Sequence, residues 1–158
     1  MTAAKRSKAK WIITIVSFVM SIIMFSAFIF GIFTKPGETT ENVGTSDYGF
    51  GNIDDAGKVV QSYKAMYMKD MQTVTGLDIE VNDETSVLTY KVVFYDEEKA
   101  YVSATETLSD DFDATSIPEN AKYFRVVIIP NQIDGEDVIL NIFNVSNYAK
   151  KLAVSYTA

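Results

Sequence analysis

The sequence predicts a single N-terminal transmembrane helix followed by an all-β antiparallel sandwich. Three observations predict this class. Residues 11–33 contain no charged side chain. Beyond residue 57, short segments alternate apolar and polar side chains with the two-residue period of β-strands. Turn-forming residues separate these segments and no long amphipathic helix pattern interrupts them, which favours a sandwich or barrel.

The first element is the apolar run from Trp11 to Phe33. As a helix its 23 residues would be about 35 Å long, enough to cross a hydrocarbon core of about 30 Å. Only Lys35 follows the run closely, whereas four cations precede it: Lys5, Arg6, Lys8 and Lys10. The positive-inside rule therefore makes residues 1–10 a cytoplasmic basic tail, 11–33 a signal anchor, and the C-terminal part extracellular.

A cleaved signal peptide is the alternative to an anchor. Its apolar core would be about 7–15 residues long and would end in a small-x-small step. The run here is longer, and the neighbours two positions from Ser26 and Ala27 are large, so an uncleaved anchor is favoured. Ser17 and Ser21 form a small-xxx-small pair of the kind that lets two membrane helices pack, and the oligomeric state is left open.

Residues 34–57 change abruptly in composition and are predicted to form a flexible, glycine-rich linker. Pro36 ends the preceding helix, and five glycines lie among Thr, Asn, Ser and Asp residues. The alternative is a functional loop, because Tyr48 and Phe50 lie within the stretch.

Residues 58–158 are predicted to form an extracytoplasmic β-sandwich domain. In residues 88–95, Tyr90, Val92 and Phe94 lie on one face, and in residues 122–129 Phe124, Val126 and Ile128 do the same. Further strands are expected over 76–81, 101–105, 138–143 and 152–156, with a turn or short helix over 146–151. Residues 65–71 suit a strand or a helix, with a strand favoured, and it stays open whether 58–71 joins the sandwich.

Composition excludes several classes of function. The chain has no Cys, so no disulfide, which fits a Gram-positive-like surface or a virus of such a cell. It has no His, which excludes a Ser-His-Asp triad and a His-ligated zinc site. After residue 10, ten Lys and Arg face 21 Asp and Glu, a balance of −11 that repels phosphate backbones. We therefore predict no catalysis, no cofactor and no nucleic-acid partner.

Two short motifs carry a family resemblance. They are Phe94-Tyr95-Asp96 at a hairpin turn and Pro118-Glu119-Asn120-Ala121-Lys122-Tyr123-Phe124-Arg125 at the entry to a strand. With these motifs the C-terminal part resembles the jelly-roll modules of Gram-positive bacteria and their phages, which are similar to carbohydrate-binding modules. The resemblance implies two antiparallel sheets and attachment to glycans or surfaces. This chain departs from such sites because its single Trp lies in the predicted span.

The candidate ligand-binding residues are Tyr95, Tyr123 and Arg125. The alternation places them off the core face, where tyrosine rings can stack on sugars. The alternative is structural, with the tyrosines paired across strands and Arg125 in an ion pair.

No metal site is assigned from the sequence. Asp110, Asp111 and Asp113 carry oxygens that calcium prefers, but their spacing matches no EF-hand loop, so calcium binding stays open.

These observations favour a membrane-anchored, surface-exposed binding or adhesion module that contacts glycan or protein, with the lipid bilayer as a further partner. The alternative is a structural assembly protein of a cell or virion surface that oligomerises through its anchor and β-domain.

Overall fold

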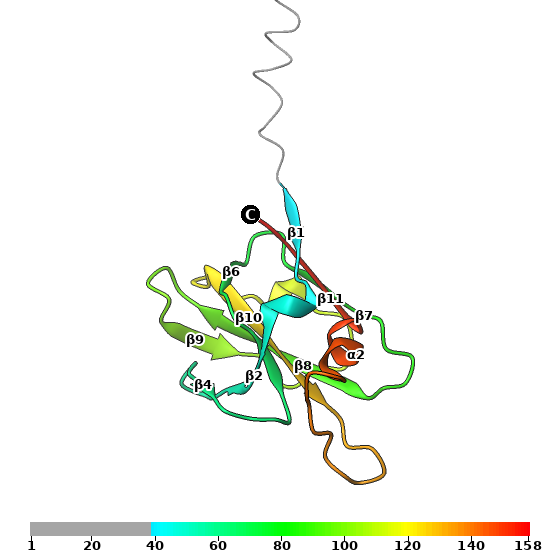
Figure 1. Ribbon diagram of the computed structural model, residues 1–158. Helices are drawn as coiled ribbons and strands as arrows, with labels where there is room; N and C mark the ends of the chain where they lie inside the picture. Colours follow the sequence, from blue (N-terminus) through cyan, green and yellow to red (C-terminus); the bar gives the residue numbers. More distant parts are fainter. Residues whose placement is uncertain (1–38) are drawn as a thin grey trace, which may run out of the picture. The chain divides into compact units, whose positions relative to one another are not determined.

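Antiparallel strands dominate residues 39–158, which are the part of the chain that the computed structural model describes (Figure 1). These residues form one compact unit, and every strand pairing among them is antiparallel. The all-β antiparallel class predicted for the domain is confirmed. The predicted basic tail, 1–10, and the predicted span, 11–33, lie outside the described residues. Within 39–158, no helix has the length and apolar character needed to cross a membrane.

The larger sheet has six strands. Its main path runs β2-β5-β10-β8-β9, and β6 pairs with the start of β10. The bounds are Tyr48–Phe50 for β2, Met66–Met68 for β5, Gln72–Thr73 for β6, Leu88–Tyr95 for β8, Tyr101–Ala104 for β9 and Tyr123–Pro130 for β10.

A second sheet of three strands has the order β1-β11-β7, and a two-stranded ribbon pairs β3 with β4. The bounds are Thr40–Asn42 for β1, Asn52–Ile53 for β3, Val59–Val60 for β4, Asp78–Val81 for β7 and Leu152–Thr157 for β11. The short helices are η1 (Thr45–Asp47), η2 (Ala114–Ser116) and α2 (Val145–Ala149). Helix α2 confirms the turn or short helix expected before the last strand.

The main core lies between the two sheets. Strands β8 and β10 pair along their whole length, from Tyr95 opposite Tyr123 to Leu88 opposite Pro130. The apolar faces predicted for these two strands are buried, and side chains from β7 and β11 pack against the same cluster. This arrangement is compatible with the predicted sandwich. Burying apolar area at about 25 cal/mol per Å² makes the interface between the sheets the main source of stability.

A second, smaller core lies on the opposite face of the six-stranded sheet. Its buried members come from the ribbon, from the segment before β5, and from the outward faces of β8 and β10: Ile53, Ala65, Val93, Tyr95 and Val127. The two central strands are therefore covered on both faces. This explains why β8 and β10 read as near-continuous apolar runs where alternation is expected for a half-exposed strand.

The predicted flexible linker over 34–57 is wrong for its described part, 39–57. Strand β1 pairs with β11, β2 pairs with β5, and β3 pairs with β4. Ile53 is fully buried and Tyr48 nearly so. The domain therefore begins near Thr39 and not at residue 58, and residues 58–71 belong to it through β4 and β5.

The glycines of this stretch serve tight backbone geometry. Gly57 closes the turn between β3 and β4 with φ +75°, a left-handed conformation that other residues adopt only with strain. A Cβ at this position would lie 2.7 Å from the Cβ of Tyr101. The composition that suggested a tether instead reflects sharp turns and close packing.

The strand predicted over 138–143 is also wrong. The segment between β10 and α2 is irregular. Hydrogen bonds from its own side-chain amides replace the backbone hydrogen bonds that a neighbouring strand would provide. Asn144 donates through Nδ2 to the carbonyl of Ile139 at 2.9 Å, and Asn141 Oδ1 accepts from the Phe143 amide at 2.9 Å. Such local bonds compete with strand pairing. Only Leu140 of the segment is buried.

Candidate functional site

A cavity of about 510 Å³ lies beside β9. Its wall is the segment 105–113, which crosses from one sheet to the other. Leu108 exchanges backbone hydrogen bonds with Tyr90 of β8, at 2.7 and 2.9 Å. Phe112 then donates its amide to the Ile79 carbonyl of β7 at 2.9 Å. Because both sheets hold this segment, the wall of the cavity is fixed by the fold itself.

Most of the residues around the cavity carry a hydroxyl or carboxyl group. They are Ser103, Thr105, Glu106, Thr107, Ser109, Asp110, Asp111, Asp113 and Ser116. The rings of Phe94 and Phe112 lie beneath, with centroids 6.3 Å apart at a tilt of 41°. Both rings are buried, so they offer no open stacking platform. The cavity therefore offers a ligand oxygen atoms set within a larger apolar surface.

Several of these oxygens already serve the fold. Asp111 Oδ1 accepts from the Val81 amide at 2.7 Å, and Asp113 Oδ1 accepts from the Thr115 amide at 2.9 Å. Hydrogen bonds from the backbone and the side chain of Thr115 hold the pKa of Asp113 below its ordinary value. Within residues 39–158, no protein hydrogen bond engages the side chains of Glu106, Thr107, Ser109 or Asp110, which leaves them available to a ligand.

Tyr90 supports this wall from inside the core. Its hydroxyl donates to the main-chain carbonyl of Asp110 at 2.7 Å. Burial, together with the nearby carboxylates of Asp111 and Asp110, raises the pKa of Tyr90 to about 12. The phenol therefore stays protonated and keeps donating across the range in which proteins are stable. Tyr90 is a positioning residue for Asp110.

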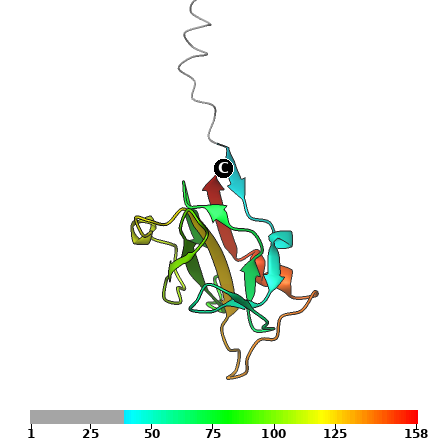
Figure 2. The same ribbon diagram turned by 90° about the vertical axis from the view of Figure 1, so that its left-hand side faces the viewer.

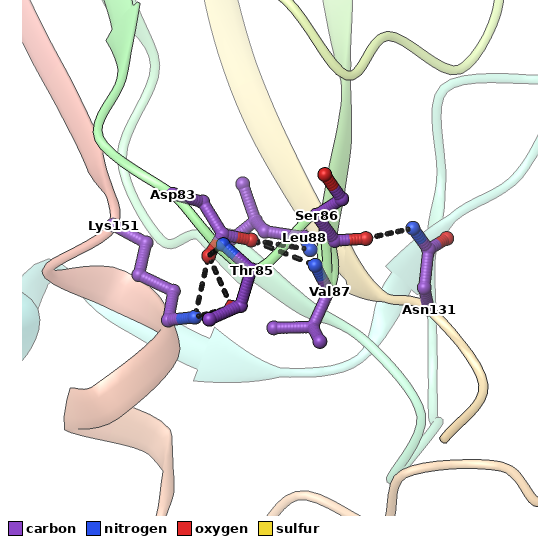
Figure 3. A network of polar contacts seen from close by, with 7 residues as sticks. All are labelled: Asp83, Thr85, Ser86, Val87, Leu88, Asn131 and Lys151. Atoms are coloured by element: carbon purple, nitrogen blue, oxygen red, sulfur yellow. Dashed lines mark hydrogen bonds and ion pairs between the residues drawn. The ribbon is translucent and has the colours of Figure 1, made fainter. Parts of the chain in front are cut away.

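A smaller cavity of about 270 Å³ shares Ser109 and Asp110 with the first. Its floor includes Asp83, the centre of the polar network drawn in Figure 3. Asp83 Oδ1 accepts from Lys151 Nζ and from the Thr85 hydroxyl, both at 2.6 Å. Its Oδ2 accepts from the amides of Val87 and Leu88, at 2.8 and 2.9 Å. The network joins the β7–β8 loop to the turn before β11.

The same network fixes the charge of Asp83. Its side chain is 1% exposed, and burial by itself would raise its pKa. The hydrogen bonds from Lys151 and Thr85 outweigh burial and hold the pKa well below the ordinary carboxyl value. Asp83 is therefore a structural anion, fully used by its protein partners.

The three predicted ligand-binding residues do come together, on the face of the second core. Tyr95 lies directly opposite Tyr123, and Arg125 is opposite Val93. The Arg125 guanidinium carbon is 6.0 Å from the Tyr95 ring centroid and 5.9 Å from that of Tyr67. These distances are at the limit of cation–π contact.

Their predicted exposure is wrong for Tyr95, which is 2% exposed and donates its hydroxyl to the Gly57 carbonyl at 3.1 Å. The segment misread as a linker covers it. Arg125 donates through Nη2 to the Lys69 carbonyl at 2.7 Å, and the Lys99 ammonium lies 5.4 Å from the Tyr123 ring centroid. The cluster binds its own chain, as the structural alternative proposed, although the partners of Arg125 are rings and a carbonyl and not an acid.

Calcium binding at Asp110, Asp111 and Asp113 gains no support from the geometry. Within the described residues, no group of three or more Asp, Glu, His or Cys side chains is placed to hold a metal ion. Two of the three carboxylates instead bond backbone amides.

The sequence interpretation missed Ser109, Thr107 and Asp83 as cavity residues. Asp83 had a local signal, since Asn82-Asp83-Glu84-Thr85-Ser86 is rich in turn-forming residues whose side chains accept backbone amides. Ser109 and Thr107 had none, because only tertiary packing places them around a hollow.

No family model, curated protein or solved structure matches the chain. The resemblance to carbohydrate-binding modules therefore rests on its two short motifs alone.

Proposed function

We propose that this protein is a membrane-anchored binding module of a cell or virion surface, and that its ligand is a neutral glycan held in the cavity beside β9. The observation behind this proposal is that four side chains at the cavity, those of Glu106, Thr107, Ser109 and Asp110, form no hydrogen bond with the described part of the chain. Sugar hydroxyls donate to carboxylates and both donate to and accept from Ser and Thr. A cavity of about 510 Å³ lies in the size range of small-ligand sites.

The charge of the cavity narrows the ligand class. Four carboxylates, those of Glu106, Asp110, Asp111 and Asp113, surround it. This field disfavours phosphorylated or acidic sugars and favours neutral ones. The smaller cavity beyond Ser109 and Asp110 extends the surface, which suits a chain of sugar units better than a single ring. We also propose that the two sheets of the domain are arranged as in a jelly roll.

Asp110→Asn tests the glycan proposal. The change keeps the shape of the side chain and removes its charge, and hydrogen bonds to charged groups contribute about 1.5–3 kcal/mol. We expect the affinity of the full chain for neutral oligosaccharides to fall roughly 10- to 100-fold, measured by titration calorimetry on a ligand selected from a glycan array.

The matched control is Asp134→Asn. Asp134 is an exposed acid in the segment 131–144, which lies outside the cavity, and its replacement should leave affinity unchanged. If the full chain binds no neutral glycan on the array, the glycan version of the proposal is lost. Equal losses from both variants would show that only overall charge matters.

The membrane anchor rests on the uncharged run at 11–33 and on the cations before it. Since β1 begins at Thr40, six residues separate it from Phe33. Fully extended, these reach at most about 20 Å. The module is then proposed to work close to the membrane and not on a long tether.

Protease protection tests the topology. With a tag at the C-terminus, protease added outside intact cells should remove the tag and leave a membrane-bound stub. The physical reason is the basic cluster, which favours retention of the N-terminus in the cytoplasm. A tag that survives external protease but is lost after lysis would place the acidic domain in the cytoplasm and contradict the proposed orientation.

The second candidate is a structural assembly protein that oligomerises through its anchor and β-domain. One observation favours it, the large apolar side chains exposed at one end of the domain.

A further inference from the structure

The exposed large apolar side chains of the described domain are confined to two stretches of chain. The stretch 50–63 contributes Phe50, Val59, Val60 and Tyr63, and the stretch 133–143 contributes Ile133, Ile139, Ile142 and Phe143. Ile142 and Phe143 are 74% and 86% exposed. We call these eight side chains the distal apolar surface.

The two stretches are joined to each other. The Leu140 amide donates to the Tyr63 carbonyl at 2.6 Å, and Lys64 pairs with Asp137 beside it. Figures 1 and 2 agree that both stretches lie at the end of the domain opposite the start of β1, with the orange segment 131–144 projecting furthest. The surface therefore faces away from the point where the chain enters the domain.

The exposed area is large for a domain of this size. Taking each whole side chain as about 150–200 Å², the eight exposed fractions amount to roughly 650–870 Å² in total. The largest apolar patch on a typical monomer is about 300–600 Å². A standard-size protein interface buries about 800 Å² on each partner. The distal apolar surface thus matches one half of such an interface.

We infer that the distal apolar surface is a self-association interface, and that its occupant is the same surface of a second copy of this chain. In a two-fold symmetric contact, the stretch 133–143 of one copy meets the stretch 50–63 of the other. Lys58, exposed on the second stretch beside the exposed Asp55, can pair with Asp134 or Glu136, which are exposed on the first.

A lipid surface fits this end of the domain less well. The stretch 133–143 carries Asp134, Glu136 and Asp137 and no Lys or Arg. Loops that bind membranes combine apolar side chains with cations that contact anionic headgroups. Acids around the apolar side chains instead disfavour a negatively charged membrane.

The first test is the mass of the full chain in detergent micelles, measured by multi-angle light scattering. We expect a dimer, and we expect Ile142→Asp combined with Phe143→Asp to raise its dissociation constant at least 100-fold. Both side chains are exposed in the single copy, so the double variant should fold normally, which circular dichroism verifies. A monomeric wild-type chain overturns the inference, as does a double variant that remains dimeric.

Crosslinking then tests the geometry, because the chain contains no native Cys. Two differently tagged full chains, one with Tyr63→Cys and one with Phe143→Cys, are mixed in detergent micelles. Oxidation should link the two tags, since a disulfide needs Cα atoms within about 7 Å. Ala153→Cys, exposed on β11 opposite Glu80 of β7 and outside both stretches, paired with Phe143→Cys should give no link, and equal links from both pairs would contradict the proposed contact.

Two further readouts separate this inference from its alternatives. Asp110→Asn, which alters the cavity, should leave the dimer intact, so failure of the glycan proposal does not affect the interface. If the chain is monomeric and phosphatidylcholine vesicles added to it protect Phe143→Cys from a thiol reagent, the occupant is lipid and the self-association inference is wrong.

Discussion

Replacement of Ile53 by alanine is expected to destabilise the domain by about 3 kcal/mol. Ile53 is 0% exposed and packs in the second core with Val93, Tyr95 and Val127. Truncating a fully buried isoleucine removes its transfer free energy and leaves a cavity, which together cost about 2–5 kcal/mol. Urea denaturation of residues 39–158, followed by circular dichroism, measures the loss.

The matched control is Ile142→Ala. Ile142 is 74% exposed, so the same chemical change should alter the free energy of unfolding by less than about 0.5 kcal/mol in the monomer. Comparison of the two variants shows whether residues 39–57 are a folded segment or a flexible linker. Equal, small effects at both positions would mean that Ile53 is not buried and that the linker prediction was right.

Replacement of Asp83 by alanine is expected to lower the free energy of unfolding by about 3 kcal/mol. The amides of Val87 and Leu88 lose their acceptor, and Lys151 loses its carboxylate partner. An unsatisfied buried donor costs about 1–3 kcal/mol, and groups bonded to a charge cost more. The same denaturation experiment measures the effect.

The stabilisation that Asp83 contributes to the folded domain should be lost as the pH falls. The pKa of Asp83 is depressed in the folded domain, so the folded state takes up its proton at lower pH than the unfolded chain does. The stabilisation is then complete above the ordinary carboxyl pKa of about 4 and declines as the pH falls below it. The difference in stability between wild type and Asp83→Asn should therefore shrink below pH 4.

Asp137→Asn provides the control for this second prediction. Asp137 also pairs with a lysine, Lys64, but the two side chains are 42% and 59% exposed. Solvent-exposed ion pairs contribute about 0–1 kcal/mol. A loss at Asp137 as large as that at Asp83 would show that burial does not set the strength of the pair.

The sequence alone predicted the strands whose side chains face a core. Strand β8 was expected over 88–95 and is found there, and β10 was expected over 122–129 and is found one residue later. The two-residue spacing of Tyr90, Val92 and Phe94 and of Phe124, Val126 and Ile128 is a local property of the sequence, so it can be read without the tertiary structure. The all-β class and its antiparallel hairpin between β8 and β9 followed from such local signals.

The same reasoning failed where side-chain contacts over long sequence distances decide the structure. Glycines at 51 and 57 suggested a linker, yet packing against Tyr67 and Tyr101 fixes the backbone there. Apolar residues at 138–143 suggested a strand, yet bonds from Asn141 and Asn144 hold an irregular segment. Composition cannot separate a tether from a chain of tight turns, because both need glycine.

The candidate site was the least predictable part. The sequence by itself determined the uncharged run at 11–33, the acidic balance of the domain, the absence of Cys and His, and the strands that form the two-sheet core. Only the tertiary structure decided that Tyr95 is covered, that Ser109 and Asp110 line a cavity, and that eight apolar side chains gather at one end. Periodicity reports which face a strand buries, whereas a cavity or a surface depends on which distant segments cover that face.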